Sequence, residues 1–174
     1  MVFLDESGFL LQPLRRRTWA PRGQTPIHYA WDRHDRLSVI SAISVSPKRQ
    51  RLRASFQVHA ENICACHVRR FLLQIRQEVR QPLIVIMDRL PAHRSAARQL
   101  LDQRDDIHVE WLPAYAPELN PVEAQWSHTK YCNLANYIPD DTSELRREVL
   151  QSLRQQRDEP TLLNSYFQAA KLTI

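Results

Sequence analysis

The chain has 174 residues, which is the usual size of one domain and enough to bury a single substantial core. Its formal net charge of +5 is compatible with a polyanionic partner. Only Lys48, Lys130 and Lys171 of the 24 basic residues are lysines. Two explanations of this arginine bias stay open: guanidinium groups match phosphate oxygens in pairs, and a GC-rich genome favours arginine codons.

Composition also excludes several classes of site. The chain has two glycines, Gly8 and Gly23, which are too few for the Gly-rich phosphate-binding loops of Walker or Rossmann nucleotide sites. The N-terminus shows no secretion signal, and no apolar run is long enough to span a membrane. We therefore expect a soluble, intracellular protein.

The three cysteines, Cys64, Cys66 and Cys132, are too few and too unevenly placed for a disulfide framework, which indicates a reducing compartment. The segment Cys64-Ala65-Cys66-His67 has the residue types of a zinc site. Structural zinc sites, however, space paired cysteines by two or more residues and need a second pair, which the chain does not supply. The sequence thus disfavours zinc here.

The first half of the chain is predicted to be an antiparallel meander. An apolar strand at the N-terminus leads into a turn at residues 5–8, and a second strand follows it. A basic, Pro-punctuated loop over residues 15–26 comes next. In the segment 37–45, alternation predicts one buried face and one face of small residues. The predicted strands of this half are 1–4, 9–11, 27–30, 37–45 and 52–58.

The second half is predicted to alternate between helices and strands. Apolar residues at helical spacing indicate a helix over residues 61–79, which has ended by Pro82. The continuous apolar run 83–87 is typical of a strand buried on both faces, and it ends at Asp88. A helix and another strand follow, so a parallel pair belongs to a mixed sheet. The remaining predicted elements are the helix 95–103, the strand 107–112 and the helices 120–131, 142–157 and 161–172.

Three acids are the candidate catalytic residues. We expect Asp5 and Asp88 at strand ends, where ligand sites of open α/β sheets collect, although either could instead cap a turn. Glu123 follows Asn120 and Pro121 at a predicted helix start, so it could equally belong to a capping box. The capping alternative explains Asn120 and Pro121 but not the two aspartates.

Converging carboxylates repel one another, so such a cluster is tolerated mainly when divalent cations fill it. Two Mg²⁺ ions roughly 4 Å apart can activate the attacking oxygen and stabilise the leaving oxygen of a phosphodiester. This chemistry needs no nucleophilic side chain. A serine-hydrolase reading is weak because Ser7 lacks the G-x-S-x-G elbow.

Four motifs occur in order along the chain: FLDESGF at 3–9, RTWAPRGQTP at 17–26, the segment 88–93, and LNPVE at 119–123 with Trp126. Together they resemble the catalytic domain of mariner-superfamily transposases, in particular the bacterial insertion-sequence branch. Each motif is weak alone, whereas four in this order and spacing are specific. The resemblance runs from Phe3 to about Lys130 and covers most of the chain.

The resemblance implies an α/β, RNase H-like fold with a mixed five-stranded sheet flanked by helices, and a site of the DDE type. Asp5, Asp88 and Glu123 then match the three ligands of two Mg²⁺ or Mn²⁺ ions. Family members cleave DNA at transposon ends and join the freed 3′-hydroxyl to target DNA, typically at TA. The implied partners are DNA and a second copy in an active homodimer, and the implied location is the bacterial cytoplasm at the nucleoid.

Two departures from the family pattern stand out. Arg89 occupies the position after the second aspartate, where relatives usually have Asn. Relatives also carry helix-turn-helix DNA-binding segments before the catalytic domain, whereas this chain opens almost directly on its first catalytic strand. We therefore expect residues 1–174 to be a single catalytic domain, from a split or frameshifted gene or from trimming, with a possible upstream helix-turn-helix partner.

Basic and aromatic residues are candidate DNA contacts. Instead of contacting DNA, the basic loop 15–26 could be a solvated segment with Trp19 packed on the sheet. His93 and Arg94 could instead lie in a plain surface turn. Trp126 is predicted to lie in the core, and Glu6 and Glu118 to point away from the site or to cap. The candidate contacts are Arg15, Arg16, Arg17, Trp19, Arg22, Arg89, His93, Arg94 and Lys130.

Two alternatives to a transposase stay open. One is an RNase H-like nuclease that cuts DNA without strand transfer. The other is a catalytically silent remnant that acts as a DNA-binding or oligomerising partner. Arg89 and the missing DNA-binding module are the two features that favour this alternative.

Overall fold

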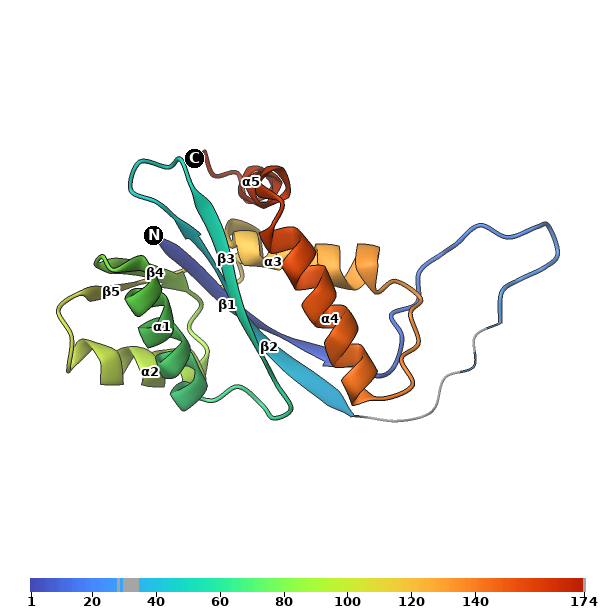
Figure 1. Ribbon diagram of the computed structural model, residues 1–174, viewed down its shortest axis with the longest axis horizontal. Coiled ribbons are helices and arrows are strands. Elements are labelled where there is room, and N and C mark those ends of the chain that lie inside the picture. Colours follow the sequence, from blue (N-terminus) through green and yellow to red (C-terminus); the bar gives the residue numbers. More distant parts are fainter. Residues whose placement is uncertain (28, 30–34, 174) are drawn as a thin grey trace.

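A mixed five-stranded sheet in the order β3-β2-β1-β4-β5 forms the centre of the molecule (Figure 1). The computed structural model describes residues 1–27, 29 and 35–173. β2 pairs antiparallel with both β1 and β3, while β4 runs parallel to both β1 and β5. The predicted sheet and its parallel pair are therefore confirmed. The strands are β1 (Val2–Leu10), β2 (Arg36–Val45), β3 (Leu52–His59), β4 (Leu83–Met87) and β5 (Ile107–Trp111).

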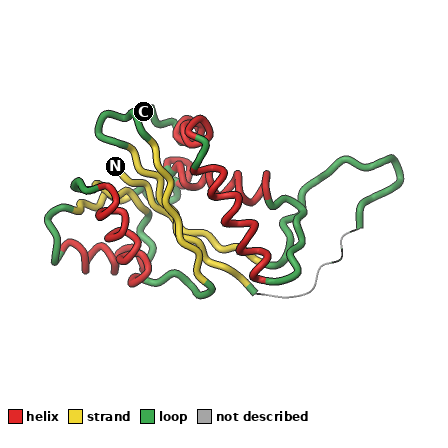
Figure 2. The backbone as a smooth tube through the Cα atoms, in the orientation of Figure 1, coloured by secondary structure: helices red, strands yellow, loops and turns green. Residues whose placement is uncertain are grey.

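Helices cover both faces of this sheet, which gives three layers (Figures 1 and 2). α1 (Ala65–Val79) and α2 (Pro91–Leu101) pack on one face around Leu4 and Ile40. The other face packs around Phe3 and Ile43 against α3 (Pro121–His128), α4 (Thr142–Arg157) and α5 (Pro160–Ala169). Among the residues described, no helix has the length and apolar character needed to cross a membrane.

Local sequence sets where the helices begin. Pro91, Pro121 and Pro160 each open a helix, where the missing N–H costs nothing. Two hydrogen bonds cap the start of α4: Asp141 Oδ1 accepts from the backbone N–H of Glu144 at 2.7 Å, and Glu144 Oε2 accepts from the backbone N–H of Asp140 at 2.6 Å.

The turn predicted at residues 5–8 is wrong, because β1 runs unbroken through it. β1 pairs with β2 from Val2 opposite Ser44 to Leu10 opposite Arg36. Gly8 is an ordinary strand residue within this ladder. Asp5 therefore lies in the middle of a strand rather than at its end.

Other boundaries also shift. The helices predicted at 61–79 and 95–103 begin at Ala65 and Pro91. β2 is buried on both faces rather than one because helices cover the sheet on both sides. Ile84 in β4 is 44% exposed, so this strand is not buried on both faces along its whole length. For the strand predicted at 27–30, residues 28 and 30 lie outside the described part, and positions 27 and 29 are not in a strand.

Candidate active site

The sheet topology brings Asp5 and Asp88 side by side. β1 and β4 are parallel neighbours, and their register pairs Val2 with Val85 and Phe3 with Ile86. Each aspartate lies two residues beyond the last of these pairs, in the same direction. The two carboxylates thus emerge where the parallel strands separate, as side chains do at the carboxyl ends of open α/β sheets.

Glu123 reaches the same place from the start of α3. The Asn120 side chain accepts from the Val122 backbone N–H at 3.2 Å and donates to the Leu4 carbonyl at 3.1 Å. This pair of bonds fixes the helix start next to β1. The Asn120 backbone N–H donates to the Pro117 carbonyl at 2.9 Å, so Glu123 does not close a capping box. Its carboxylate makes no hydrogen bond with the described residues and is free for another role.

The three carboxylates line one open pocket of about 520 Å³. The loop between β5 and α3 also lines this pocket. Within this loop, Tyr115 is fully exposed and has a backbone φ of 58°. A non-glycine residue in this left-handed region stores strain, which often accompanies a functional loop. Tyr115 was assigned no role of its own from the sequence, although it lies only four residues before the LNPVE motif. The remaining lining residues are Arg89, Leu90, Pro91, Leu112, Pro113, Ala114, Ala116, Pro117 and Asn120.

Asp5 is the most buried of the three acids, with 8% of its surface exposed. Its Oδ2 accepts a hydrogen bond from Trp126 Nε1 at 2.9 Å. Burial, followed by repulsion from Glu123 and then Asp88, raises the pKa of Asp5 to about 7. Trp126 is in the core as predicted, but its bond to Asp5 was missed, although its place one helical turn after Glu123 points in that direction.

Asp88 is held by two donors that approach one oxygen. Its Oδ1 accepts from His93 Nδ1 at 2.6 Å and from the Leu90 backbone N–H at 3.1 Å, while Oδ2 accepts nothing from the described residues. Burial would raise the pKa of Asp88, but these hydrogen bonds outweigh it and hold the pKa below its usual value. Burial would likewise lower the pKa of His93, but the bond to Asp88 raises it.

The prediction that His93 contacts DNA is wrong for this structure, because its side chain is wholly buried. His93 lies on α2, at the face of the sheet opposite α3. Its Nε2 has no hydrogen-bond partner and lies 4.0 Å from Glu6 Oε1. Glu6 alternates with Asp5 along β1 and so points to the opposite face of the sheet, as expected.

Two basic residues, Arg89 and Lys130, lie close to the carboxylates. Arg89 is exposed and lines the pocket. Lys130 is partly buried; its Nζ donates to Ser7 Oγ at 2.6 Å and lies 5.3 Å from the centre of the Phe9 ring. Burial lowers the pKa of Lys130, and the charges of Glu123 and Asp5 oppose this shift. Arg94 is exposed on α2.

The basic loop extends away from the helices α3 and α4 (Figure 1). Trp19 is fully exposed, so it does not pack on the sheet. Arg16 is tied down, since its Nη1 donates to the Tyr131 carbonyl at 2.8 Å and its guanidinium lies over the Tyr131 ring. Arg15, Arg16 and Arg17 line an open groove of about 940 Å³ that continues along α3 and α5. The neighbouring Arg22 is also exposed.

Comparison with known proteins identifies the family. A family model described as DDE superfamily endonuclease matches residues 1–146. The chain belongs to this superfamily. A search of the curated proteins found no match.

Solved structures similar to this DDE endonuclease domain show the same fold. The Mos1 mariner paired-end complex with Mn matches at a TM-score of 0.69 and 16% identity, covering 98% of this chain and 53% of that chain. The Mos1 transposase catalytic domain with Raltegravir and Mn matches at 0.62 and 14%, covering 98% and 78%. A simian T-cell lymphotropic virus intasome matches at 0.54 and 14%, covering 87% and 46%.

The RNase H-like fold implied by the sequence resemblance is thus confirmed. The chain spans about half the length of the Mos1 transposase in its paired-end complex. Mos1 complexes have been solved with Mn and with Mg.

The donor set of the DDE endonuclease pocket fits hard divalent cations, because carboxylate oxygens are the ligands they prefer. Asp88 Oδ2 and both oxygens of Glu123 are uncommitted among the described residues. The carboxylate oxygens of Asp5, Asp88 and Glu123 do not all lie within 4.8 Å of one another, in contrast to the donor atoms of other clusters in the described part of the chain. A trio that shares two ions does not need to close around one.

Metal-free protein is expected to lose stability as pH rises towards 7. The pKa of Asp5 is raised from 3.8 to about 7, so folding favours the protonated carboxyl. The resulting contribution is fully present below the unfolded pKa of about 4 and is lost as pH rises through about 7. Urea unfolding in EDTA between pH 5 and 8 measures this loss. Asp5→Asn removes the titrating group and should flatten the decline; parallel curves for the two proteins would contradict the assignment.

Proposed function

We propose that this chain is the catalytic domain of a DNA transposase that cleaves DNA at transposon ends and transfers the 3′-hydroxyl into target DNA. The observation that carries the proposal is the convergence of Asp5, Asp88 and Glu123 on one pocket from β1, β4 and α3. Membership of the DDE endonuclease superfamily and the mariner-like fold support it. Two copies and an upstream helix-turn-helix partner on bacterial DNA complete the proposed assembly.

Asp5, Asp88 and Glu123 would hold two Mg²⁺ or Mn²⁺ ions. When bound, such ions activate the attacking oxygen and stabilise the leaving oxygen of a phosphodiester. Trp126 orients Asp5 by donating to Oδ2, which fixes the rotation of that carboxylate. His93 and the Leu90 N–H hold Asp88 by Oδ1 and leave Oδ2 uncommitted. Arg89 places a positive charge at the pocket wall, where it can meet a phosphate.

The test is a plasmid assay in Mn²⁺ or Mg²⁺ with a labelled oligonucleotide that carries a free 3′-hydroxyl. A transposase domain nicks the plasmid and also joins the labelled 3′ end to it. Nicking without joined product would favour the nuclease alternative. Neither activity, with DNA binding intact, would favour the silent partner. Glu123→Gln supplies the control, because it removes the charge of a carboxylate that makes no hydrogen bond with the described residues.

The exposed arginines of the loop are expected to contact DNA phosphates. The double change Arg15→Ala and Arg17→Ala should weaken DNA binding and reduce the slope of log affinity against log salt by about 2, since each phosphate contact contributes roughly 0.9. Fluorescence anisotropy between 50 and 200 mM salt measures both effects. Arg98→Ala with Arg104→Ala removes the same charge beside α2 and should change binding little. Equal losses in the two double variants would show that only net charge matters.

A further inference from the structure

A second cluster of metal-ligand side chains lies where β3 leads into α1. It consists of residue types that the proposed phosphodiester chemistry does not use. Two groups within it have donor atoms that all lie within 4.8 Å of one another, and His67 belongs to both. The groups are Cys64, Cys66 and His67, and His59, Glu61 and His67.

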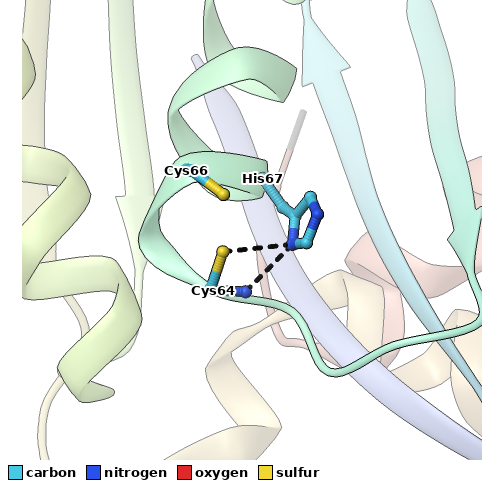
Figure 3. A group of neighbouring side chains, drawn as sticks. All are labelled: Cys64, Cys66 and His67. Carbon is cyan, nitrogen blue, oxygen red and sulfur yellow. Dashed lines mark hydrogen bonds between the residues drawn. The ribbon is translucent and has the colours of Figure 1, made fainter.

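The ring of His67 is oriented as a metal-bound histidine would be. Its Nδ1 lies 3.3 Å from Cys64 Sγ, and Figure 3 shows both cysteine sulfurs on that side of the ring. Its Nε2 lies 3.0 Å from Glu61 Oε1. Metal-ligating histidines almost always donate their other ring N–H to a carboxylate or carbonyl, which fixes the tautomer. With its proton on Nε2, His67 keeps a lone pair on Nδ1 facing the sulfurs.

The surroundings hold this ring in place. The His67 side chain is only 11% exposed, and its ring centre lies 4.5 Å from that of His59. His59 Nε2 is buried and has no hydrogen-bond partner. The Nδ1 of His67 also accepts from the Cys64 backbone N–H at 3.2 Å. Cys64 and His67 form the capping box of α1 through this bond, so a cation at Nδ1 would displace the Cys64 N–H from that nitrogen.

We propose that Cys64, Cys66 and the Nδ1 of His67 form a binding site for a thiophilic divalent cation of the zinc class, with Glu61 orienting His67. Two thiolates and an imidazole suit zinc and are poor ligands for Mg²⁺. Both cysteines are exposed, so the fourth position is open to water. The sequence disfavoured zinc because a second cysteine pair is lacking; in the fold, His67 supplies the third ligand and Glu61 its support.

This site is separate from the carboxylate pocket. Cys66 and His67 lie in the first turn of α1, which packs on the face of the sheet opposite α3. The carboxylate pocket has oxygen donors, whereas this cluster has sulfur and nitrogen donors. The two sites therefore select different cations, and the new site does not depend on the proposed transposase activity.

Cobalt binding tests the proposal, because Co²⁺ substitutes for zinc and reports its ligands by absorption. The full chain, reduced and stripped of metal, is titrated with Co²⁺ in excess Mg²⁺, which competes for carboxylate oxygens but not for thiolates. One equivalent should bind with a thiolate-to-cobalt charge-transfer band and the intense visible bands of tetrahedral coordination. Zinc should then displace it.

Variants assign the ligands. Cys64→Ser, Cys66→Ser and His67→Asn should each lower cobalt affinity at least about tenfold and weaken the charge-transfer band. Glu61→Gln should keep the band with roughly 10–100-fold weaker affinity, as expected of an outer-sphere partner. Cys132→Ser is the matched control, since Cys132 is exposed and lies elsewhere, and it should bind as the unmodified protein does. Absence of the band, or a band that survives in Cys64→Ser and Cys66→Ser, would overturn the proposal.

Discussion

Asp88→Asn is expected to reduce metal-dependent DNA nicking at least about a thousandfold, which corresponds to about 4 kcal/mol of transition-state stabilisation. The substitution removes a negative charge from the pocket and replaces an uncommitted carboxylate oxygen. DNA binding should remain, because the arginine loop that we propose contacts DNA is a separate segment of the chain. Rate measurements over a range of Mn²⁺ concentrations, with anisotropy for DNA binding, give both quantities.

Two controls make this result interpretable. Asp88 pairs with the buried His93, so its loss also costs stability. Glu123→Gln should reduce nicking comparably with little change in melting temperature, because the Glu123 carboxylate makes no hydrogen bond with the described residues. Asp105→Asn makes the same chemical change at an exposed residue between α2 and β5 and should leave activity unchanged. Full activity of Asp88→Asn in a folded protein would refute the catalytic assignment.

Trp126→Ala is expected to have the largest effect on stability, about 3–5 kcal/mol of unfolding free energy. The ring is 3% exposed, packs edge-on against Phe9 and donates to Asp5. Trp126→Phe keeps most of the packing but removes the donor, so it should cost about 1–3 kcal/mol. Urea unfolding in EDTA measures both changes.

Trp19→Ala is the matched control for this series. Trp19 is fully exposed, and such surface substitutions usually change stability by less than about 0.5 kcal/mol. The expected order of destabilisation is Trp126→Ala, then Trp126→Phe, then Trp19→Ala. If Trp126→Ala were no more destabilising than Trp19→Ala, the packing described for α3 against β1 would be wrong.

The spacing of apolar residues and the positions of prolines were enough to predict most of the fold. The apolar run of β4, the helical spacing of α1 and Pro121 at the start of α3 are local signals, and each reflects local backbone or packing preferences. The strand–helix–strand order of β4, α2 and β5 then determines that these two strands are parallel. The mixed sheet followed from these elements alone.

What was mispredicted depends on pairing across the sheet. Residues 5–8 have turn composition, but β2 pairs with β1 on both sides of Gly8 and keeps the strand continuous. The burial of His93 likewise depends on how α2 packs on the sheet, and nothing in the local segment 88–94 reports it. The motifs single out three acids that line one pocket, whereas the hydrogen bonds of Trp126 and His93 to two of them required the tertiary structure.

The most direct test of the central claim is anomalous diffraction from crystals of the protein grown or soaked with Mn²⁺. Manganese peaks are expected in the pocket between Asp5, Asp88 and Glu123, and they should be lost from crystals of Asp88→Asn. The absence of manganese from this pocket, or peaks that persist unchanged in Asp88→Asn, would contradict the assignment of these carboxylates as the metal ligands of a DDE nuclease site.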